Sequence, residues 1–431
     1  MGNLRLMWKK GLWLGLAAFG LSSLASAQEV KVVGVYTLPP MDLKVLNPHL
    51  SEEDIREAQA RGWPRVDQPG IGSGLFYLGN GRFLGLTDRG PNGDCPKGKD
   101  GLYFPLPRFA PAVVVFRLEE VGKRLRLEAP FPLKAPNGSF LSGLPSREDQ
   151  KPAYLDASCN TPLQRDAGGV DPEDVASLPG GQGYLVVEEN APALLYVDPQ
   201  GTVRMGYVPK GIQILAPYPV KAILPEVLAL RRENRGLENL ALSEDGKTAW
   251  VVLQSPIGST KDPAYAESLV ARAVRLDVSD PMNVRVTGLY FVPFSSPTEY
   301  PKANQPKDMK FSAAAWVGGE RILLLERAEG GARIFLVDFA QATNLLDHPM
   351  GQSPDLDRAG VDYGTLGIRL PVKKLLLETW RLTEFDTDKL EGLTLLEDRR
   401  TLAIANDNDF AIGGKEGPSR VWLVRLPEAL R

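Results

Sequence analysis

Histidine is nearly absent from this chain: its 431 residues include only His49 and His348. This scarcity excludes a histidine-rich metal site and argues against a Ser-His-Asp triad. Each histidine is expected to lie in a loop, although either could still act alone. Cysteine is equally scarce, with Cys95 and Cys159 only. The two cysteines can pair in an oxidising compartment or remain free thiols.

Basic tracts and long apolar runs are also missing. The net charge is −3 and no cluster of Lys and Arg stands out, so nucleic acid is not an expected partner. The first 27 residues combine a basic start, a short apolar run from Gly11 to Gly20 and the small-residue string Ala25-Ser26-Ala27. We interpret residues 1–27 as a cleaved signal peptide and residues 28–431 as a single exported domain, periplasmic or secreted. No stable membrane span is expected, and a monomer is favoured.

The chain is rich in turn residues, with 43 Gly and 36 Pro. One pattern recurs: a polar or acidic residue after a turn, a strand-like run, and a second polar cluster about 16 residues later. The copies begin at Glu173, Glu238, Asp308 and Glu391, with a weaker copy at Ser73. Repeated hairpins of this kind predict an all-β fold, a β-propeller of about five to six four-stranded blades with short helical insertions.

Several segments carry more local predictions. Residues 30–36 alternate like a strand and are expected to complete the last blade by joining the C-terminal strands. Asn80-Gly81 marks a hairpin turn, and Ser51 is expected to cap a short helix that ends near Arg61. Residues 220–235 are interpreted as a helix. A sixth, degenerate blade would have room in 122–154 or in 344–380.

Carboxylates occupy matching places in the repeats, and in a propeller such positions converge around the central axis. A ring of oxygen ligands suits Ca²⁺, which binds six to eight oxygens. Mutually repelling carboxylates also need a cation to be stable together. The alternative is that these acids cap turns or accept backbone N–H groups between blades. The expected calcium ligands are Asp88, Glu173, Glu189, Glu238, Glu391, Asp407 and Asn408.

Two arginines stand beside these acids. Arg89 follows Asp88 and Arg327 follows Glu326, so each is expected either to bind the anionic part of a substrate or to form a structural ion pair. Gln254 holds the corresponding place in another repeat and is expected to contact substrate. Glu188 and Glu326 are the expected general bases, and with Arg89 and Arg327 they make up the predicted catalytic set.

The motifs taken together resemble the phytase-like family, also described by an esterase-like activity. They include L-T-D-R-G-P-N-G, D-P-E-D-V-A, N-R-G-L-E-N-L-A-L-S-E-D-G and A-N-D-N-D-F, in the expected order from about Gly72 to Leu426. The resemblance implies an exported bacterial β-propeller. It places the implied site at Asp88, Arg89, Glu173, Glu188, Glu189, Glu238, Gln254, Glu326, Arg327, Glu391, Asp407 and Asn408. The acidic signature of true β-propeller phytases is replaced by Asp171-Pro172-Glu173-Asp174.

Three functions remain open at this stage. The leading hypothesis is an exported, calcium-dependent hydrolase of phosphate esters or small carboxylic esters, acting on a small anionic substrate. The second is a non-catalytic propeller that binds a ligand or a partner and holds a structural metal. The third is a lactonase-like hydrolase, which would use the same calcium-binding propeller on a different substrate.

Overall fold

The computed structural model describes residues 29–414 and 416–431, so the expected signal peptide lies outside the described residues. Twenty strands form five successive four-stranded blades, and the first and last blades join in one eight-stranded sheet. Blade 1 comprises β2 (Gly74–Gly79), β3 (Arg82–Leu86), β6 (Ala112–Glu119) and β7 (Arg124–Pro132). Blade 2 comprises β9 (Pro172–Ser177), β10 (Tyr184–Glu188), β11 (Ala193–Val197) and β12 (Val203–Pro209), with β13 (Val220–Leu224) added in parallel. Blade 3 comprises β14 (Leu237–Leu242), β15 (Thr248–Leu253), β16 (Val270–Asp277) and β17 (Arg285–Pro293).

The last two blades close the circle. Blade 4 comprises β18 (Lys310–Gly318), β19 (Arg321–Ala328), β20 (Gly331–Asp338) and β21 (Val372–Glu378). Blade 5 comprises β22 (Leu390–Leu395), β23 (Thr401–Asn406), β24 (Arg420–Arg425) and the N-terminal β1 (Lys31–Thr37). The first strand of each blade contacts the first strand of the next, in the order β2, β9, β14, β18, β22 and back to β2. The described residues therefore form a five-bladed propeller, and the β-propeller prediction is confirmed.

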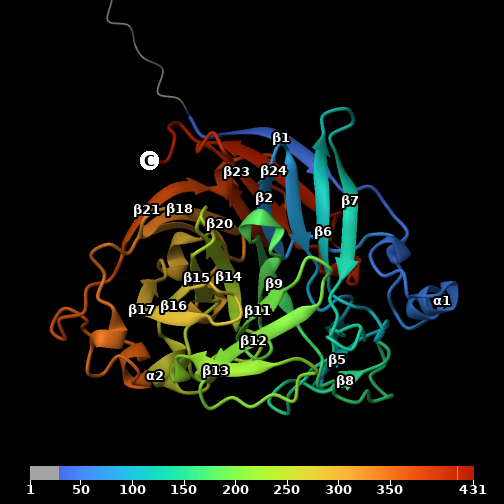
Figure 1. Cartoon of the computed structure of the whole chain (residues 1–431), viewed down its shortest axis with the longest axis horizontal. Coiled ribbons are helices and arrows are strands. Elements are labelled where there is room, and N and C mark those ends of the chain that lie inside the picture. The colour runs from blue at the N-terminus through green and yellow to red at the C-terminus, as the bar shows by residue number, and fades with distance from the viewer. Residues whose placement is uncertain (1–28, 415) are drawn as a thin grey trace, which may run out of the picture.

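The two ends of the chain meet in blade 5. Strand β1 pairs antiparallel with β24, as predicted for residues 30–36, so the outer edge of the last blade is covered. Figure 1 shows β1 in blue lying beside β23 and β24 in red. No sixth blade exists among the described residues, because β7 completes blade 1 and β21 completes blade 4. The insertion between β20 and β21 holds only short 3₁₀ turns, η6 (Leu345–Asp347) and η7 (Pro354–Asp357).

The helices are short. Helix α1 (Glu52–Ala60) begins at Ser51 with the predicted capping box, and α2 (Pro263–Ala266) spans one turn. Further 3₁₀ turns are η1 (Leu43–Val45), η2 (Pro179–Gly181), η3 (Glu226–Leu230), η4 (Pro297–Glu299), η5 (Pro306–Asp308), η8 (Thr379–Arg381) and η9 (Asp409–Ala411). The predicted helix over residues 220–235 is wrong. Its first part pairs with β12 as β13, and Pro225 keeps the residue before it extended.

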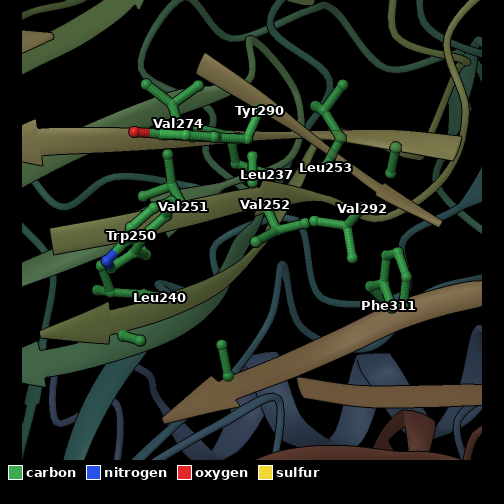
Figure 2. Packing of buried hydrophobic residues seen from close by; sticks show 14 of the residues in the cluster. Leu237, Leu240, Trp250, Val251, Val252, Leu253, Val274, Tyr290, Val292 and Phe311 are labelled. Atoms are coloured by element: carbon green, nitrogen blue, oxygen red, sulfur yellow. The ribbon is translucent and has the colours of Figure 1, made fainter. Parts of the chain in front are cut away.

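Hydrophobic cores fill the spaces between neighbouring blades. Figure 2 shows part of one of them, where Val292 of blade 3 lies beside Phe311 of blade 4. Trp250 is fully buried and stacks on Phe339 at a ring distance of 4.2 Å. Apolar contacts hold the blades together. Packing between blades therefore does not explain why polar side chains gather near the central axis.

A small layer of loops lies beyond the blades. It contains the three-stranded sheet of β4 (Gly93–Asp94), β5 (Leu102–Tyr103) and β8 (Ala153–Tyr154). Cys95 and Cys159 form a disulfide across this layer, so the paired alternative for the two cysteines is confirmed. No helix within the described part of the chain is long and apolar enough to cross a membrane.

Candidate functional site

A polar cavity of 640 Å³ opens where the inner strands begin. Residues at the starts of β9, β14, β18 and β22 line it, together with residues just after the second strands and part of the loop layer. The lining carboxylates are Asp88, Asp94, Asp171, Glu173, Glu189, Glu233, Glu238, Glu391, Asp407, Asp409 and Glu416. The lining cationic side chains are Arg89, Lys151, Arg235, Lys310, Arg327 and Lys389.

A shared irregularity of the inner strands positions these groups. In β9, β14, β18 and β22 the pairing register shifts across one residue near the start of the strand. The residues at the four shifts are Glu173, Glu238, Ser312 and Glu391. Such β-bulges re-aim a side chain, and the three glutamates line the cavity.

The fourth repeat was therefore placed wrongly in the sequence. Asp308, its expected start, lies in η5, where its carboxylate accepts the backbone N–H of Gln305 at 3.1 Å. Ser312 holds the matching place and accepts a hydrogen bond from Arg327 Nε at 2.7 Å. Blade 4 thus presents an arginine and a hydroxyl at the position where three other blades present a glutamate.

The densest acidic group consists of Asp171, Glu173 and Glu189. One carboxylate oxygen of each lies within 4.8 Å of the others, and all three residues are buried. Glu173 makes no hydrogen bond and no ion pair with any described residue. Burial and the nearby charges of Glu238 and Glu189 raise its pKa well above the usual value. A buried carboxyl among like charges must either hold a proton or share a cation.

Arg89 neutralises part of this group. It forms ion pairs with Asp171 and, at 3.4 Å, with Glu189, and it donates a hydrogen bond to Asn234. Of the two alternatives predicted for Arg89, the structure shows the structural ion pair. Arg89 also lines the cavity. Asp171 was missed in the sequence because it precedes the repeat start by two residues. Its place in the acidic string Asp171-Pro172-Glu173-Asp174 was the available signal.

Further buried oxygens in the cavity lack hydrogen-bond partners within the described residues. They include Glu189 Oε1, Glu238 Oε2, Gln254 Oε1 and Asp407 Oδ1. Gln254 donates its amide N–H to Glu238, which leaves the amide oxygen free. Carboxylate and amide oxygens are the donor types that calcium prefers, so the residues present fit such an ion.

Two other acids of the ring, Glu391 and Asp407, have cationic partners. Glu391 forms an ion pair with Arg327, and Lys389 pairs with Asp409 and, at 3.5 Å, with Asp407. Burial raises the pKa of Asp407 well above its ordinary range and raises that of Asp88 to about 7. Asp88, Glu173 and Glu238 form no ion pair among the described residues, and of these three only Glu173 belongs to the dense group with Asp171 and Glu189.

Both predicted general bases lie outside the cavity lining. Glu188 accepts backbone N–H groups from Ala191 at 2.7 Å and Asn190 at 2.9 Å, and burial raises its pKa to about 7. Glu326 accepts the hydroxyl of Tyr300 at 2.8 Å and pairs with Lys373. Both carboxylates are therefore engaged by the protein itself, and the prediction that they act as general bases has no support from their positions.

Asn408, an expected calcium ligand, likewise uses its side chain within the protein. Its side-chain oxygen accepts the backbone N–H of Phe410 at 3.1 Å, and its amide donates to Gly417 O at 3.2 Å. It is fully buried and does not line the cavity. Its side chain therefore anchors the loop that follows β23.

Below the cavity, Asp174 is a buried carboxylate near the axis. It accepts the backbone N–H groups of Val175 at 2.8 Å and, from the next blade, Leu240 at 2.9 Å. Burial raises its pKa well above the ordinary value. Gly74 of blade 1 lies so close that an added Cβ would be 2.8 Å from the Asp174 Cα. Asp174 thus ties three inner strands together beneath the polar cavity.

Solved structures similar to this chain are propellers and other proteins of low sequence identity. The periplasmic gluconolactonase of Pseudomonas aeruginosa is 12% identical, with 84% of this chain and 89% of that chain covered and a TM-score of 0.30. A DUF4221 member from Bacteroides vulgatus is 9% identical, with 92% and 98% covered and a TM-score of 0.34. A protein from Bacteroides ovatus that is described as a "putative hydrolase" is 11% identical, with 86% of this chain and 89% of that chain covered and a TM-score of 0.33.

No curated protein matches the chain. A family model does match, over residues 69–410, which contain blades 1 to 4, strands β22 and β23 of blade 5 and every carboxylate of the cavity except Glu416. Its description is phytase-like, esterase-like activity of phytase. The expected resemblance is thereby confirmed, and this chain belongs to the phytase-like family.

Proposed function

We propose that this protein is an exported, calcium-dependent hydrolase of small anionic esters, either phosphate esters or carboxylic esters. The observation that carries the proposal is the buried group of Asp171, Glu173 and Glu189, in which Glu173 has no cationic partner. The group opens into a cavity large enough for a small molecule. The family description, which names an esterase-like activity, agrees with this chemistry.

Asp171, Glu173 and Glu189 would hold the ion. Calcium bound there supplies Lewis-acid polarisation of an ester oxygen and makes a nearby water more acidic. Glu238 takes the role of proton acceptor, since its Oε2 is buried in the cavity without a hydrogen-bond partner among the described residues. Gln254 donates a hydrogen bond to the other oxygen of Glu238 and so holds that carboxylate in place.

Export is part of the same proposal. The Cys95–Cys159 disulfide suits an oxidising compartment, which supports a periplasmic or secreted location. Residues 1–27 would be removed on the way. Intact-mass measurement of the protein recovered from its native compartment tests this point, because a chain that starts at Gln28 is expected.

A non-catalytic propeller is the second candidate. It is favoured by the positions of Glu188 and Glu326, since both predicted bases are occupied by structural contacts. In that case the cavity would hold a structural ion and bind its ligand without turnover. The two candidates differ in whether any ester is hydrolysed, not in whether calcium binds.

A calcium titration of residues 28–431 separates the candidates. Melting temperature and hydrolysis of p-nitrophenyl phosphate, p-nitrophenyl acetate and a small lactone are followed together. The hydrolase predicts that calcium raises both stability and turnover, and the substrate that responds identifies the ester class. Glu238→Gln should then retain calcium binding and lose turnover, whereas Glu173→Gln should lose both. Higher stability without turnover would favour the binding protein.

A further inference from the structure

The cationic side of the cavity contains like charges placed directly opposite each other. Lys310 of β18 and Arg327 of β19 are register partners in the antiparallel pair, and both line the cavity. Like charges at directly opposed positions destabilise a sheet. Arg327 is held by Glu391 and Ser312, but Lys310 makes no ion pair or hydrogen bond with its side chain among the described residues.

Arg235 adds a third positive charge. It precedes β14 and lines the same cavity, and its Nη1 is buried without a hydrogen-bond partner within the described chain. Its side chain also makes no ion pair there. The charges of Arg327 and Arg235, together with burial, lower the pKa of Lys310 to about 7. The three cations therefore lie near enough to disfavour one another.

Most buried arginines in the described part of the chain have carboxylate partners, whereas Arg232 donates to the carbonyls of Gly258 and Tyr265. Arg272 pairs with Asp357, both fully buried, and Arg333 pairs with Glu378 at 2.7 Å. Arg89 pairs with Asp171 as described above. A fold that satisfies these arginines internally leaves Arg235 and Lys310 without partners at the wall of a cavity. Arg235 and Lys310 are half-buried, and an unpaired cation that is partly removed from water is costly unless a ligand supplies the negative charge.

We propose that Arg235, Lys310 and Arg327 form a binding site for an oxyanion, the phosphoryl or carboxylate group of a small ligand. Arg327 is fixed by Glu391 and Ser312, while Arg235 and Lys310 supply the free donors. As the substrate-binding part of the ester hydrolase, this assignment rests on the proposed function. Binding of the anionic part of the substrate, which was expected of Arg89, is thereby assigned to Arg235 and Lys310, whose N–H donors are free.

Anion binding can be measured without any metal. Isothermal titration of residues 28–431 in EDTA is carried out with inorganic phosphate and, separately, with acetate, and the protein is expected to bind at least one of them saturably. Phosphate alone would identify the phosphoryl source, and acetate alone would identify the carboxylate source. Arg235→Gln and Lys310→Gln should each weaken binding by about tenfold or more, because each removes a charge-assisted hydrogen bond. Lys310→Arg should restore most of it.

Two further readouts guard against loss of folding. In buffer without phosphate, Lys310→Gln should melt no lower than wild type, since it relieves the repulsion with Arg327. Arg285→Gln, an exposed arginine on β17 of blade 3, is the matched control and should bind phosphate as wild type does. Absence of saturable binding of both anions by wild type, or unchanged binding by both glutamine variants, overturns the proposal.

The same variants separate this proposal from the metal site. Arg235→Gln and Lys310→Gln should bind calcium as wild type does, and Glu173→Gln should still bind the anion. Anion binding without any calcium binding would overturn the proposed function and leave the oxyanion site standing. Calcium binding with no anion binding would do the reverse.

Discussion

Glu173 is the residue at which one change of charge should alter the protein most clearly. Its carboxylate lies within 4.8 Å of those of Asp171 and Glu189, and two full charges at that distance repel by about 3 kcal/mol at an effective dielectric constant near 20. Arg89 compensates its two neighbours but not Glu173. In calcium-free buffer at pH 8, Glu173→Gln should therefore be more stable than wild type by up to about 3 kcal/mol. For a domain of this size, that corresponds to a rise in Tm of about 3 °C.

Calcium should remove most of this difference. At a calcium concentration 100 times Kd, wild type should gain about 2.7 kcal/mol, again about 3 °C, whereas Glu173→Gln should gain much less. Calorimetry in EDTA and across a calcium titration measures both effects. The exposed Glu267→Gln is the control and should follow wild type in both buffers. If Glu173→Gln melts below wild type in EDTA and still responds fully to calcium, Glu173 is neither uncompensated nor a ligand.

Three further predictions concern stability. Asp174→Ala leaves two buried backbone N–H groups without acceptors and should cost about 4 kcal/mol in a denaturant titration, whereas Asp174→Asn keeps an acceptor and should cost less. Replacing Cys95 and Cys159 by serine opens a loop of sequence separation 64 and should cost about 4 kcal/mol, without loss of calcium binding. The folded pKa of Glu188 is about 7, above its unfolded value, so the stability it contributes is lost as pH rises from about 4.5 through 7. Wild type should lose about 3 kcal/mol more than Glu188→Gln over that window, and equal slopes would show that Glu188 titrates normally.

The architecture was accessible from the sequence because each blade buries the same kind of alternating hairpin. The position of residues 30–36 was also accessible, since an outer strand at one end of the chain can cover an open edge at the other. Residues 220–235 were not. Their apolar spacing suits a helix, but residues 220–224 pair with the free edge of β12 and form a strand. This pairing depends on the neighbouring strand β12, about which the spacing of apolar residues in 220–235 carries no information.

The site was predicted in its general character but not in its detail. Consecutive residues of a strand point to opposite sides, so only one of Glu188 and Glu189 can face the axis. The residue that lines the cavity lies sixteen positions after the glutamate at each β-bulge. These residues are Glu189 after Glu173, Gln254 after Glu238 and Asp407 after Glu391. A strict spacing would therefore have favoured Glu189 over Glu188. No spacing rule would have placed Lys310 opposite Arg327, because that contact depends on the bulge at Ser312.

The cavity contains uncompensated groups of both charge signs, and the fold does not let them cancel. Glu173 is without a cation, while Arg235 and Lys310 are without a carboxylate, although all three line one cavity. The register of the inner strands fixes each of these groups in its own blade, so they cannot approach one another as a flexible ion pair would. A cation on the acidic side and an oxyanion on the basic side would satisfy both. An anionic ester that binds next to calcium meets these two requirements at once, which is why substrate and metal should each raise the affinity for the other.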